Sequence, residues 1–197
     1  MNNTNEELIK GRISAIHKNN YTIRFEGKDI PARLKGSFYD LMTDRFPVVG
    51  DYVSFEYNPI GDSLIVSVLD RSGLLQRPDQ AKTGVMQYMV ANVDYTFIVT
   101  SLNEDYSYNR IARYVSVVLQ GHSIPVVVLT KSDLCSNYGR YIREVESISD
   151  KVKVHAISAL YGIGTDELEQ YMRPGVTICL MGSSGGWKVN TFKCFCW

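Results

Sequence analysis

The sequence is poor in cysteine, in net charge and in long apolar runs, and each shortage excludes a class of protein. Four of the 197 residues are cysteine and two of these are isolated in the chain, so no disulfide framework or zinc cluster is expected. This cysteine usage is typical of a reducing compartment, and we therefore expect a cytoplasmic location. Lys and Arg balance Asp and Glu at 21 each, which gives no overall attraction to nucleic acid or an anionic membrane. No apolar run approaches the roughly 20 residues of a spanning helix, and the polar N-terminus lacks a signal-peptide core, so no membrane partner is expected.

The first part of the chain consists of short segments that alternate between apolar and polar residues and are separated by turns. Strands are expected over residues 11–16, 21–25, 30–34, 48–57 and 63–69. About five short strands with turn signals between them indicate a small β-barrel, and an OB-fold is the first choice.

From residue 93 the pattern changes to continuous apolar runs that alternate with segments of helical spacing. Strands are expected over 93–100, 124–129, 152–157 and 177–181, and helices over 108–120, 141–148 and 165–171. This alternation predicts a parallel sheet with crossover helices. We therefore divide the chain into a barrel (1–72), a junction (73–92), part of an α/β P-loop domain (93–185) and a probable non-native tail (186–197). The tail follows no helical or strand period, and a domain without its remaining strands is expected to leave a sheet edge unpaired.

The segment after the last expected strand resembles a phosphate-binding loop that is interrupted. Such a loop reads G-x-x-x-x-G-K-[ST], and its backbone N–H groups cradle phosphates. Five residues match it by spacing: Gly182, Ser183, Ser184, Gly185 and Lys188. Trp187 stands where the second glycine belongs, and a tryptophan does not let the backbone close on a phosphate. Val189 stands where the magnesium-binding hydroxyl belongs and has no ligand oxygen.

One extra base in the coding sequence accounts for this interruption. Suppose residues 186–191 are encoded by GGT-TGG-AAA-GTC-AAC-ACT, followed by T. Removal of one G then gives GTT-GGA-AAG-TCA-ACA-CTT, which encodes Val-Gly-Lys-Ser-Thr-Leu and completes the loop. We therefore expect a chain that is frameshifted within the loop and truncated after it. The alternative is a degenerate loop in a relative that binds no nucleotide.

The expected strand over 124–129 leads directly into Thr130-Lys131-Ser132-Asp133, which matches the pattern Asn/Thr-Lys-x-Asp. Ligands of parallel sheets gather at the carboxyl ends of the strands. An aspartate there can accept hydrogen bonds from the ring N–H and the exocyclic amine of guanine, a donor pair that adenine lacks. Lys131 can lay its methylene stem along the base. The alternative is a polar turn in which Asp133 caps a helix.

A second short motif, Ser158-Ala159, follows the next expected strand, where GTPases present a backbone N–H to the guanine carbonyl. Here the guanine motifs precede the P-loop and follow a barrel, the reverse of the ordinary order. With this order, several specific strings make the chain resemble the circularly permuted GTPases, specifically the ribosome small-subunit-dependent GTPase A family (RsgA, also called YjeQ). These strings cover residues 11–13, 46–53, 91–100, 125–134 and 180–185.

The resemblance implies an OB-fold that contacts ribosomal RNA (rRNA), a permuted GTPase domain, and zinc only in a C-terminal part that this chain lacks. It implies GTP and magnesium as cofactors, GTP hydrolysis, and action on the small ribosomal subunit. The residues implied to read guanine are Thr130, Lys131, Asp133, Ser158 and Ala159, and those at the phosphates are Gly182, Ser183, Ser184, Gly185 and Lys188. No catalytic or metal-binding residue is expected in this chain, which should not hydrolyse GTP, because phosphoryl transfer depends on a positioned metal and water.

A second hypothesis is a non-enzymatic RNA-binding OB module with a pseudo-GTPase scaffold. The aromatic residues Tyr21 and Phe25 are interleaved with seven basic residues: Lys10, Arg12, Lys18, Arg24, Lys28, Arg33 and Lys35. OB-folds bind single strands through basic grooves and stacking aromatics. Five acidic residues offset this charge, however, and alternating charges are usually the solvated face of a strand: Glu26, Asp29, Asp40, Asp44 and Asp51.

Overall fold

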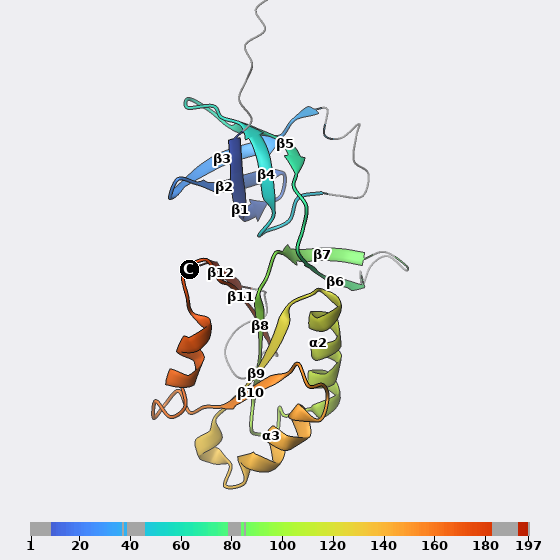
Figure 1. Ribbon diagram of the computed structural model, residues 1–197, viewed down its shortest axis with the longest axis vertical. Coiled ribbons are helices and arrows are strands. Elements are labelled where there is room, and N and C mark those ends of the chain that lie inside the picture. The colour runs from blue at the N-terminus through green and yellow to red at the C-terminus, as the bar shows by residue number, and fades with distance from the viewer. Residues whose placement is uncertain are drawn as a thin grey trace, which may run out of the picture. The chain divides into compact units, whose positions relative to one another are not determined.

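The computed structural model describes residues 9–36, 38, 46–78, 84, 86–182 and 193–196, which form two units (Figure 1). The first unit contains the described residues up to Ser72 together with 89–92, and the second contains those of 73–88 and from Val93 onwards. None of the helices in this part of the chain combines the length and apolar character that a membrane-spanning helix needs.

The first unit is a closed five-stranded barrel. Its strands are β1 (Ile9–His17), β2 (Asn20–Phe25), β3 (Lys28–Leu34), β4 (Tyr52–Glu56) and β5 (Ser63–Val68). They close in the order β1-β2-β3-β5-β4, and only the β3–β5 pair is parallel, so the predicted OB-type barrel is confirmed. The strand expected over 48–57 begins only at Tyr52, because Gly50 turns the chain with a φ of 89°.

The barrel is filled by the inward-facing residues of these alternating strands. In β2 the two inward positions, Tyr21 and Ile23, are buried while their neighbours are wholly or partly exposed. The shared core consists of Ile13, Tyr21, Ile23, Ala32, Phe38, Val53, Phe55 and Ile65. Register shifts in the β1–β2 and β4–β5 pairs mark bulges, which bend the strands around this core.

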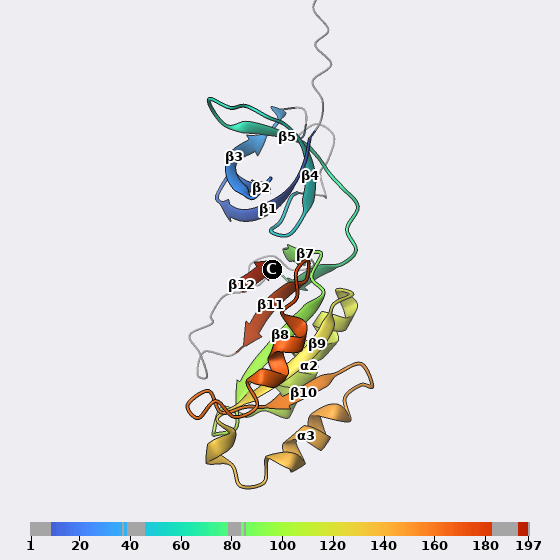
Figure 2. The same cartoon turned by 60° about the vertical axis from the view of Figure 1, so that its left-hand side comes forward.

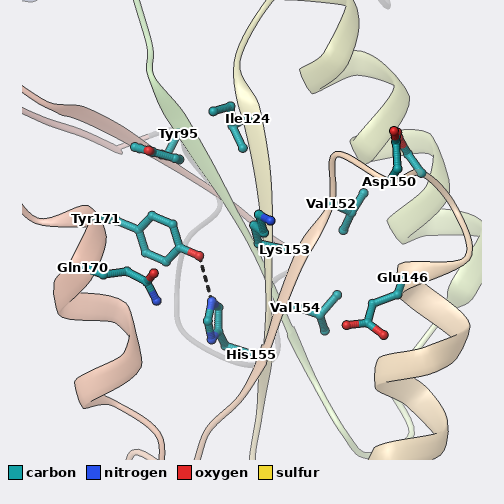
Figure 3. Close-up of a pocket in the computed structure, with 11 residues that line it drawn as sticks. Tyr95, Ile124, Glu146, Asp150, Val152, Lys153, Val154, His155, Gln170 and Tyr171 are labelled. Atoms are coloured by element: carbon teal, nitrogen blue, oxygen red, sulfur yellow. Dashed lines mark hydrogen bonds between the residues drawn. The ribbon is translucent and has the colours of Figure 1, made fainter.

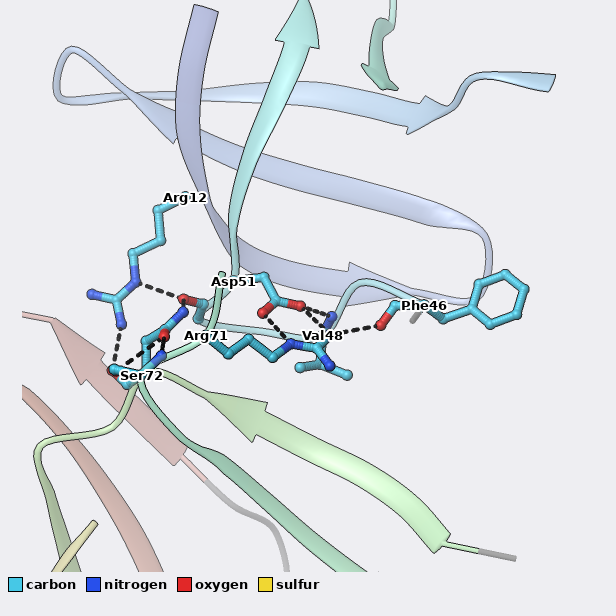
Figure 4. Close-up of polar contacts among 8 residues, drawn as sticks. Arg12, Phe46, Val48, Asp51, Arg71 and Ser72 are labelled. Atoms are coloured by element: carbon cyan, nitrogen blue, oxygen red, sulfur yellow. Dashed lines mark hydrogen bonds and ion pairs between the residues drawn. The ribbon is translucent and has the colours of Figure 1, made fainter. Parts of the chain in front are cut away.

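A buried carboxylate anchors the base of the barrel (Figure 4). The Asp51 side chain is fully buried, and the Arg71 guanidinium donates to both of its oxygens over 2.8 Å. The Val48 N–H donates to the same carboxylate at 2.8 Å, and Arg71 also donates to the Phe46 carbonyl at 3.0 Å. Because Arg71 lies 20 residues from Asp51 and 25 from Phe46, this ion pair ties the 46–51 turn to the chain where it leaves the barrel at residue 71.

The returning segment 89–92, assigned to the junction from sequence, lies in the barrel unit. The Asn92 amide donates to the Gly50 carbonyl at 3.0 Å, and its oxygen accepts from the Ser72 N–H at 2.8 Å. Arg12 donates to the carbonyls of Gly50 and Asn92 at 3.1 and 3.0 Å (Figure 4). Side-chain amides and guanidinium groups therefore satisfy the carbonyls of this turn.

The second unit is built on a five-stranded sheet in the order β10-β9-β8-β11-β12. Its strands are β8 (Tyr95–Ser101), β9 (Ile124–Thr130), β10 (Lys153–Ala156), β11 (Thr177–Gly182) and β12 (Lys193–Cys196). The first four in the sheet order are parallel, as predicted, and β12 is antiparallel to β11. Strand β12 thus pairs with β11 and becomes the edge strand on that side of the described sheet. Backbone pairing needs only main-chain groups, so a segment without side-chain periodicity still extends the sheet.

Helices cover both faces of this sheet (Figures 1 and 2). They are α2 (Tyr108–Gln120), α3 (Tyr138–Glu146) and two 3₁₀ helices, η1 (Ser132–Leu134) and η2 (Asp166–Tyr171). Helices α2 and α3 pack on one face over a core that includes Ile98, Leu129 and Val115. On the other face Tyr171 of η2 packs over Phe97. The three predicted helices are present, the last of them as a 3₁₀ helix.

The junction contains a hairpin that the sequence analysis missed. Strands β6 (Leu74–Pro78) and β7 (Met86–Ala91) pair with each other as a two-stranded sheet. Both are short and mostly exposed or half-buried in the described residues, so neither has the strong alternation that identifies a strand from sequence.

Candidate functional site

Three of the sequence motifs meet at one edge of the second unit's sheet. Strands β8 to β11 run parallel, so their carboxyl ends lie together. Thr130 at the end of β9 is in register with Ser101 of β8, and Gly182 at the end of β11 is in register with Val99. This is the edge at which open α/β sheets bind ligands.

The Thr130–Asp133 segment is a rigid turn. The buried Thr130 hydroxyl donates to the Thr100 carbonyl at 3.3 Å. Lys131 adopts the left-handed conformation, with φ 60° and ψ 39°, which reverses the chain at the end of β9. The Ser132 N–H then donates to the Ile157 carbonyl at 3.1 Å. The turn is thus fastened to both neighbouring strands, which leaves Lys131 half-buried and Asp133 exposed.

The Ser158–Ala159 motif lies in a small closed loop after β10. Ser158 and Ile163 exchange two backbone hydrogen bonds of 2.9 and 3.1 Å. Gly162 and Gly164 supply the positive φ values, 67° and 70°, that the reversal requires. Ser158 is buried and Ala159 is exposed, so the loop turns Ala159 outwards beside the Thr130–Asp133 turn.

Several polar groups at this edge have no hydrogen-bond partner within the described part of the chain. The exposed Asp133 carboxylate makes no ion pair or hydrogen bond there, and it does not cap η1. The buried hydroxyls of Ser158 and Thr100 are unpaired among the same residues. Buried polar groups are normally satisfied, so an edge with free acceptors and hydroxyls fits a polar planar ligand such as a purine base.

Only the first residue of the phosphate-loop motif lies within the described residues. Gly182 ends β11, where a Cβ would stand 2.7 Å from the Val99 carbonyl oxygen, so the close strand approach requires glycine. The predicted positions Ser183, Ser184, Gly185 and Lys188 lie outside the described residues.

The sequence does not supply the metal-binding hydroxyl of a phosphate loop. Val189 offers no oxygen at the position of the metal-binding hydroxyl. Within the described residues no group of three or more His, Cys, Asp or Glu side chains is placed to hold a metal.

Two tyrosines of the second unit have perturbed hydroxyls that sequence reasoning missed. Burial, and then the 2.8 Å hydrogen bond to Glu144, raises the pKa of Tyr106. Burial, with Tyr95 and Glu167 nearby, raises the pKa of Tyr171. Both groups stay protonated at neutral pH. Glu144 and Tyr95 come from other elements than the tyrosines they act on, so no local sequence signal identifies these contacts.

An OB-type barrel followed by a P-loop-type domain, with the guanine motifs ahead of the phosphate loop, is the architecture of a circularly permuted GTPase. A family model for the RsgA GTPase matches residues 68–190. The chain belongs to the RsgA GTPase family.

Curated relatives agree with this assignment. The chain is 35% identical over 176 residues to "Small ribosomal subunit biogenesis GTPase RsgA 1" of Listeria monocytogenes, covering 89% of this chain and 49% of that protein. It is 34% identical over 188 residues to the Methanosarcina acetivorans protein named "Small ribosomal subunit biogenesis GTPase RsgA", covering 95% and 50%. The chain thus spans about half the length of the curated relatives it matches.

Solved structures give the same fold. YjeQ from Thermotoga maritima superposes with a TM-score of 0.71 at 28% identity, covering 91% of this chain and 62% of that one. YloQ, described as a circularly permuted GTPase, superposes with a TM-score of 0.67 at 21% identity, covering 94% and 63%.

Proposed function

We propose that this chain carries the guanine-reading half of a GTPase that acts in biogenesis of the small ribosomal subunit, in the cytoplasm. The single observation that carries the proposal is the fastened turn at the end of β9. Its Ser132 N–H bond to Ile157 holds the Thr130–Asp133 turn against the Ser158 loop, and the Asp133 carboxylate remains exposed and unpaired within the described residues.

Each residue of this edge has a defined role in the proposal. Asp133 accepts from the ring N–H and the amine of guanine, and Lys131 lies along the base. The backbone N–H of Ala159 donates to the guanine carbonyl beside Ser158, and Thr130 holds the turn. Adenine presents no matching donor pair and leaves the carboxylate unsatisfied, which favours guanine by a few kcal/mol.

The phosphate-binding half of the site is incomplete in this amino-acid sequence. In the proposal Gly182, Ser183, Ser184, Gly185 and Lys188 surround the phosphates, but Trp187 obstructs the backbone cradle and Val189 lacks the metal-binding hydroxyl. GTP and magnesium are the cofactors of the intact site. We therefore expect guanine recognition without GTP hydrolysis above background in this chain.

Loop repair tests the proposal. The substitutions Gly186→Val, Trp187→Gly, Val189→Ser and Asn190→Thr restore the P-loop pattern. Competition binding with GTP, ATP and XTP should then show a preference for GTP over ATP of at least roughly tenfold. Asp133→Asn in the repaired chain turns one acceptor into a donor, so the preference should move from GTP to XTP, whose exocyclic oxygen can accept.

The matched control is Asp166→Asn, which removes one exposed negative charge in η2, away from the motif. It should leave the GTP preference unchanged. Equal binding of GTP and ATP by the repaired chain, or an unchanged guanine preference in the Asp133→Asn variant, would show that the Thr130–Asp133 turn does not recognise guanine. If the unrepaired chain releases phosphate from GTP, and this release disappears in the Asp133→Ala variant, the prediction that the chain does not hydrolyse GTP is wrong.

A second candidate function, RNA binding by the barrel with the second unit as scaffold, has partial support. Arg24, Arg33 and Lys35 are ion-paired with acidic residues, which neutralises much of the basic stretch. Lys28 and the half-exposed Tyr57 line a cleft of about 420 Å³ between the β2–β3 and β4–β5 loops. A Lys28→Glu/Tyr57→Ala variant should weaken binding of the chain to small-subunit rRNA, while unchanged binding would remove this candidate.

The coding DNA separates the two functions. A one-base shift after the codon for Gly185 that opens a frame with switch motifs and a Cys/His zinc cluster supports the GTPase. An uninterrupted gene in which Trp187 and Val189 stand in the only open frame supports the pseudo-GTPase scaffold.

A further inference from the structure

Strand β10 forms an edge of the second unit's sheet within the described residues. It pairs in parallel with β9 through Lys153 to Ala156. The next residue, Ile157, donates to Leu129 and accepts from Ser132, so both of its main-chain groups face β9 and the segment that follows it. Main-chain groups alternate along a strand, and those of Val154 and Ala156 therefore face the free edge.

Only part of this edge is covered by the chain itself. At its carboxyl end a Cβ on Gly164 would stand 2.8 Å from the Ala156 oxygen, so the Ser158–Ile163 loop closes over that carbonyl. At its amino end the Val152 N–H donates a hydrogen bond to the Ser149 carbonyl at 3.1 Å. Between these points the Val154 N–H and C=O have no partner among the described residues. An edge of this kind accepts another strand.

A cleft of about 620 Å³ straddles β10 and makes room for such a strand (Figure 3). One side is formed by Val154, by Glu146 at the end of α3 and by Asp150 in the turn that follows. The other side is mainly aromatic and apolar, with Tyr171 and Tyr95 in edge contact at 4.9 Å between ring centroids and Ile124 43% exposed. Lys153, His155 and Gln170 also line the cleft. The two sides therefore differ in chemistry.

The floor of the apolar side is held rigid. His155 bridges η2 and β10, with its Nδ1 2.6 Å from Glu167 and its Nε2 2.9 Å from the Tyr171 hydroxyl. The Tyr171 ring also packs edge-on against Phe97 at 5.5 Å. The cleft is thus a preformed feature of the second unit, which lowers the ordering cost of binding.

We propose that β10 is a docking edge for an extended peptide segment in which basic and apolar residues alternate. The peptide backbone pairs with Val154, and its side chains point alternately to the two sides of the cleft. Basic side chains meet Glu146 and Asp150, which are exposed and have no ion pair among the described residues. Apolar side chains meet Tyr95, Ile124 and Tyr171.

Charge distinguishes this occupant from a second copy of the chain. If two β10 strands paired about a two-fold axis, α3 of both copies would lie on the same face of the joined sheet. Glu146 and Asp150 of one copy would then face their own counterparts, and like charges disfavour that pairing. This interaction surface lies at the amino ends of β8 and β9, away from the proposed nucleotide edge, and is independent of the proposed function.

The test uses the full chain and an acetylated, amidated hexapeptide of alternating lysine and valine. Isothermal titration calorimetry should show saturable binding, with at least tenfold weaker binding of the matching glutamate–valine peptide. A lysine–valine peptide N-methylated at alternate residues loses the N–H groups that face β10 and should bind at least tenfold more weakly. Amide hydrogen exchange of Val154 should slow when the parent peptide binds.

Two matched double variants complete the experiment. Glu146→Lys/Asp150→Lys should weaken binding of the lysine–valine peptide about tenfold or more, whereas Glu26→Lys/Asp70→Lys, the same charge change at exposed positions of the first unit, should not. Equal binding by both double variants, or full binding of the N-methylated peptide, overturns the proposal. If the chain alone sediments as a dimer and its Val154 amide is protected from hydrogen exchange, a second copy of the chain occupies the β10 edge. This result also overturns the proposal.

Discussion

The buried Asp51–Arg71 ion pair should dominate the stability of the barrel, and Asp51→Asn measures this. The substitution keeps the shape of the side chain but removes the charge that two 2.8 Å bonds from Arg71 and one from Val48 satisfy. Asp51 is fully buried and the Arg71 side chain is only 14% exposed, so the substitution removes a carboxylate charge from a pair that is shielded from water.

Removing one partner of a buried pair costs about 3–5 kcal/mol, a large fraction of a typical unfolding free energy of about 5–15 kcal/mol. Since each 1.36 kcal/mol is a factor of ten, amide hydrogen exchange in the barrel should accelerate by roughly 10² to 10³-fold or more. Hydrogen exchange followed by mass spectrometry of peptides from β2 and β5 measures the opening of the barrel separately from that of the second unit.

The control is Asp29→Asn, which breaks an ion pair with Arg24 whose side chains are 52% and 55% exposed. A pair this exposed contributes about 0–1 kcal/mol. Adding Arg71→Met to Asp51→Asn should recover part of the lost stability, because the poorly hydrated guanidinium that has lost the Asp51 carboxylate is then removed as well. If Asp51→Asn changes barrel exchange no more than Asp29→Asn does, the ion pair is not what holds the base of the barrel.

Tyr106→Phe should lower the free energy of unfolding at pH 7 by about 1 kcal/mol, since it deletes the bond to Glu144. The pKa of Tyr106 is raised in the folded chain, so its contribution to stability is present below the unfolded pKa of about 10 and is lost as the pH rises through the folded pKa. Above pH 10 the free energy of unfolding, measured by urea titration, should therefore fall less steeply with pH in the variant than in the parent. Gly182→Ala should destabilise the second unit by roughly 1–3 kcal/mol in urea unfolding, because its Cβ would stand 2.7 Å from the Val99 oxygen. Gly175→Ala, with nothing within 4 Å of its Cβ but a φ of 82°, separates backbone strain from close contact, and a larger loss there than at Gly182 would refute the contact argument.

The elements that carry their own periodicity were predictable from the sequence. The alternation in Tyr21–Phe25 and the apolar run of Ile124–Leu129 depend on local spacing, and β2 and β9 lie there. The order of the Thr130–Asp133, Ser158–Ala159 and Gly182 motifs likewise defined the permuted GTPase family, because each motif is a contiguous string. Parallel pairing of the strands that precede these motifs was enough to predict that they share one edge.

What depends on residues far apart in the chain was decided only by the tertiary structure. Asp51 is an ordinary acidic residue in the sequence, and only the closed barrel buries it against Arg71. The return of residues 89–92 to the barrel, the pairing of β12 with β11 and the cleft over β10 all join segments through main-chain groups or surfaces. Main-chain groups are the same in every residue except proline, so their partners leave no local signal, and only the folded arrangement selects them.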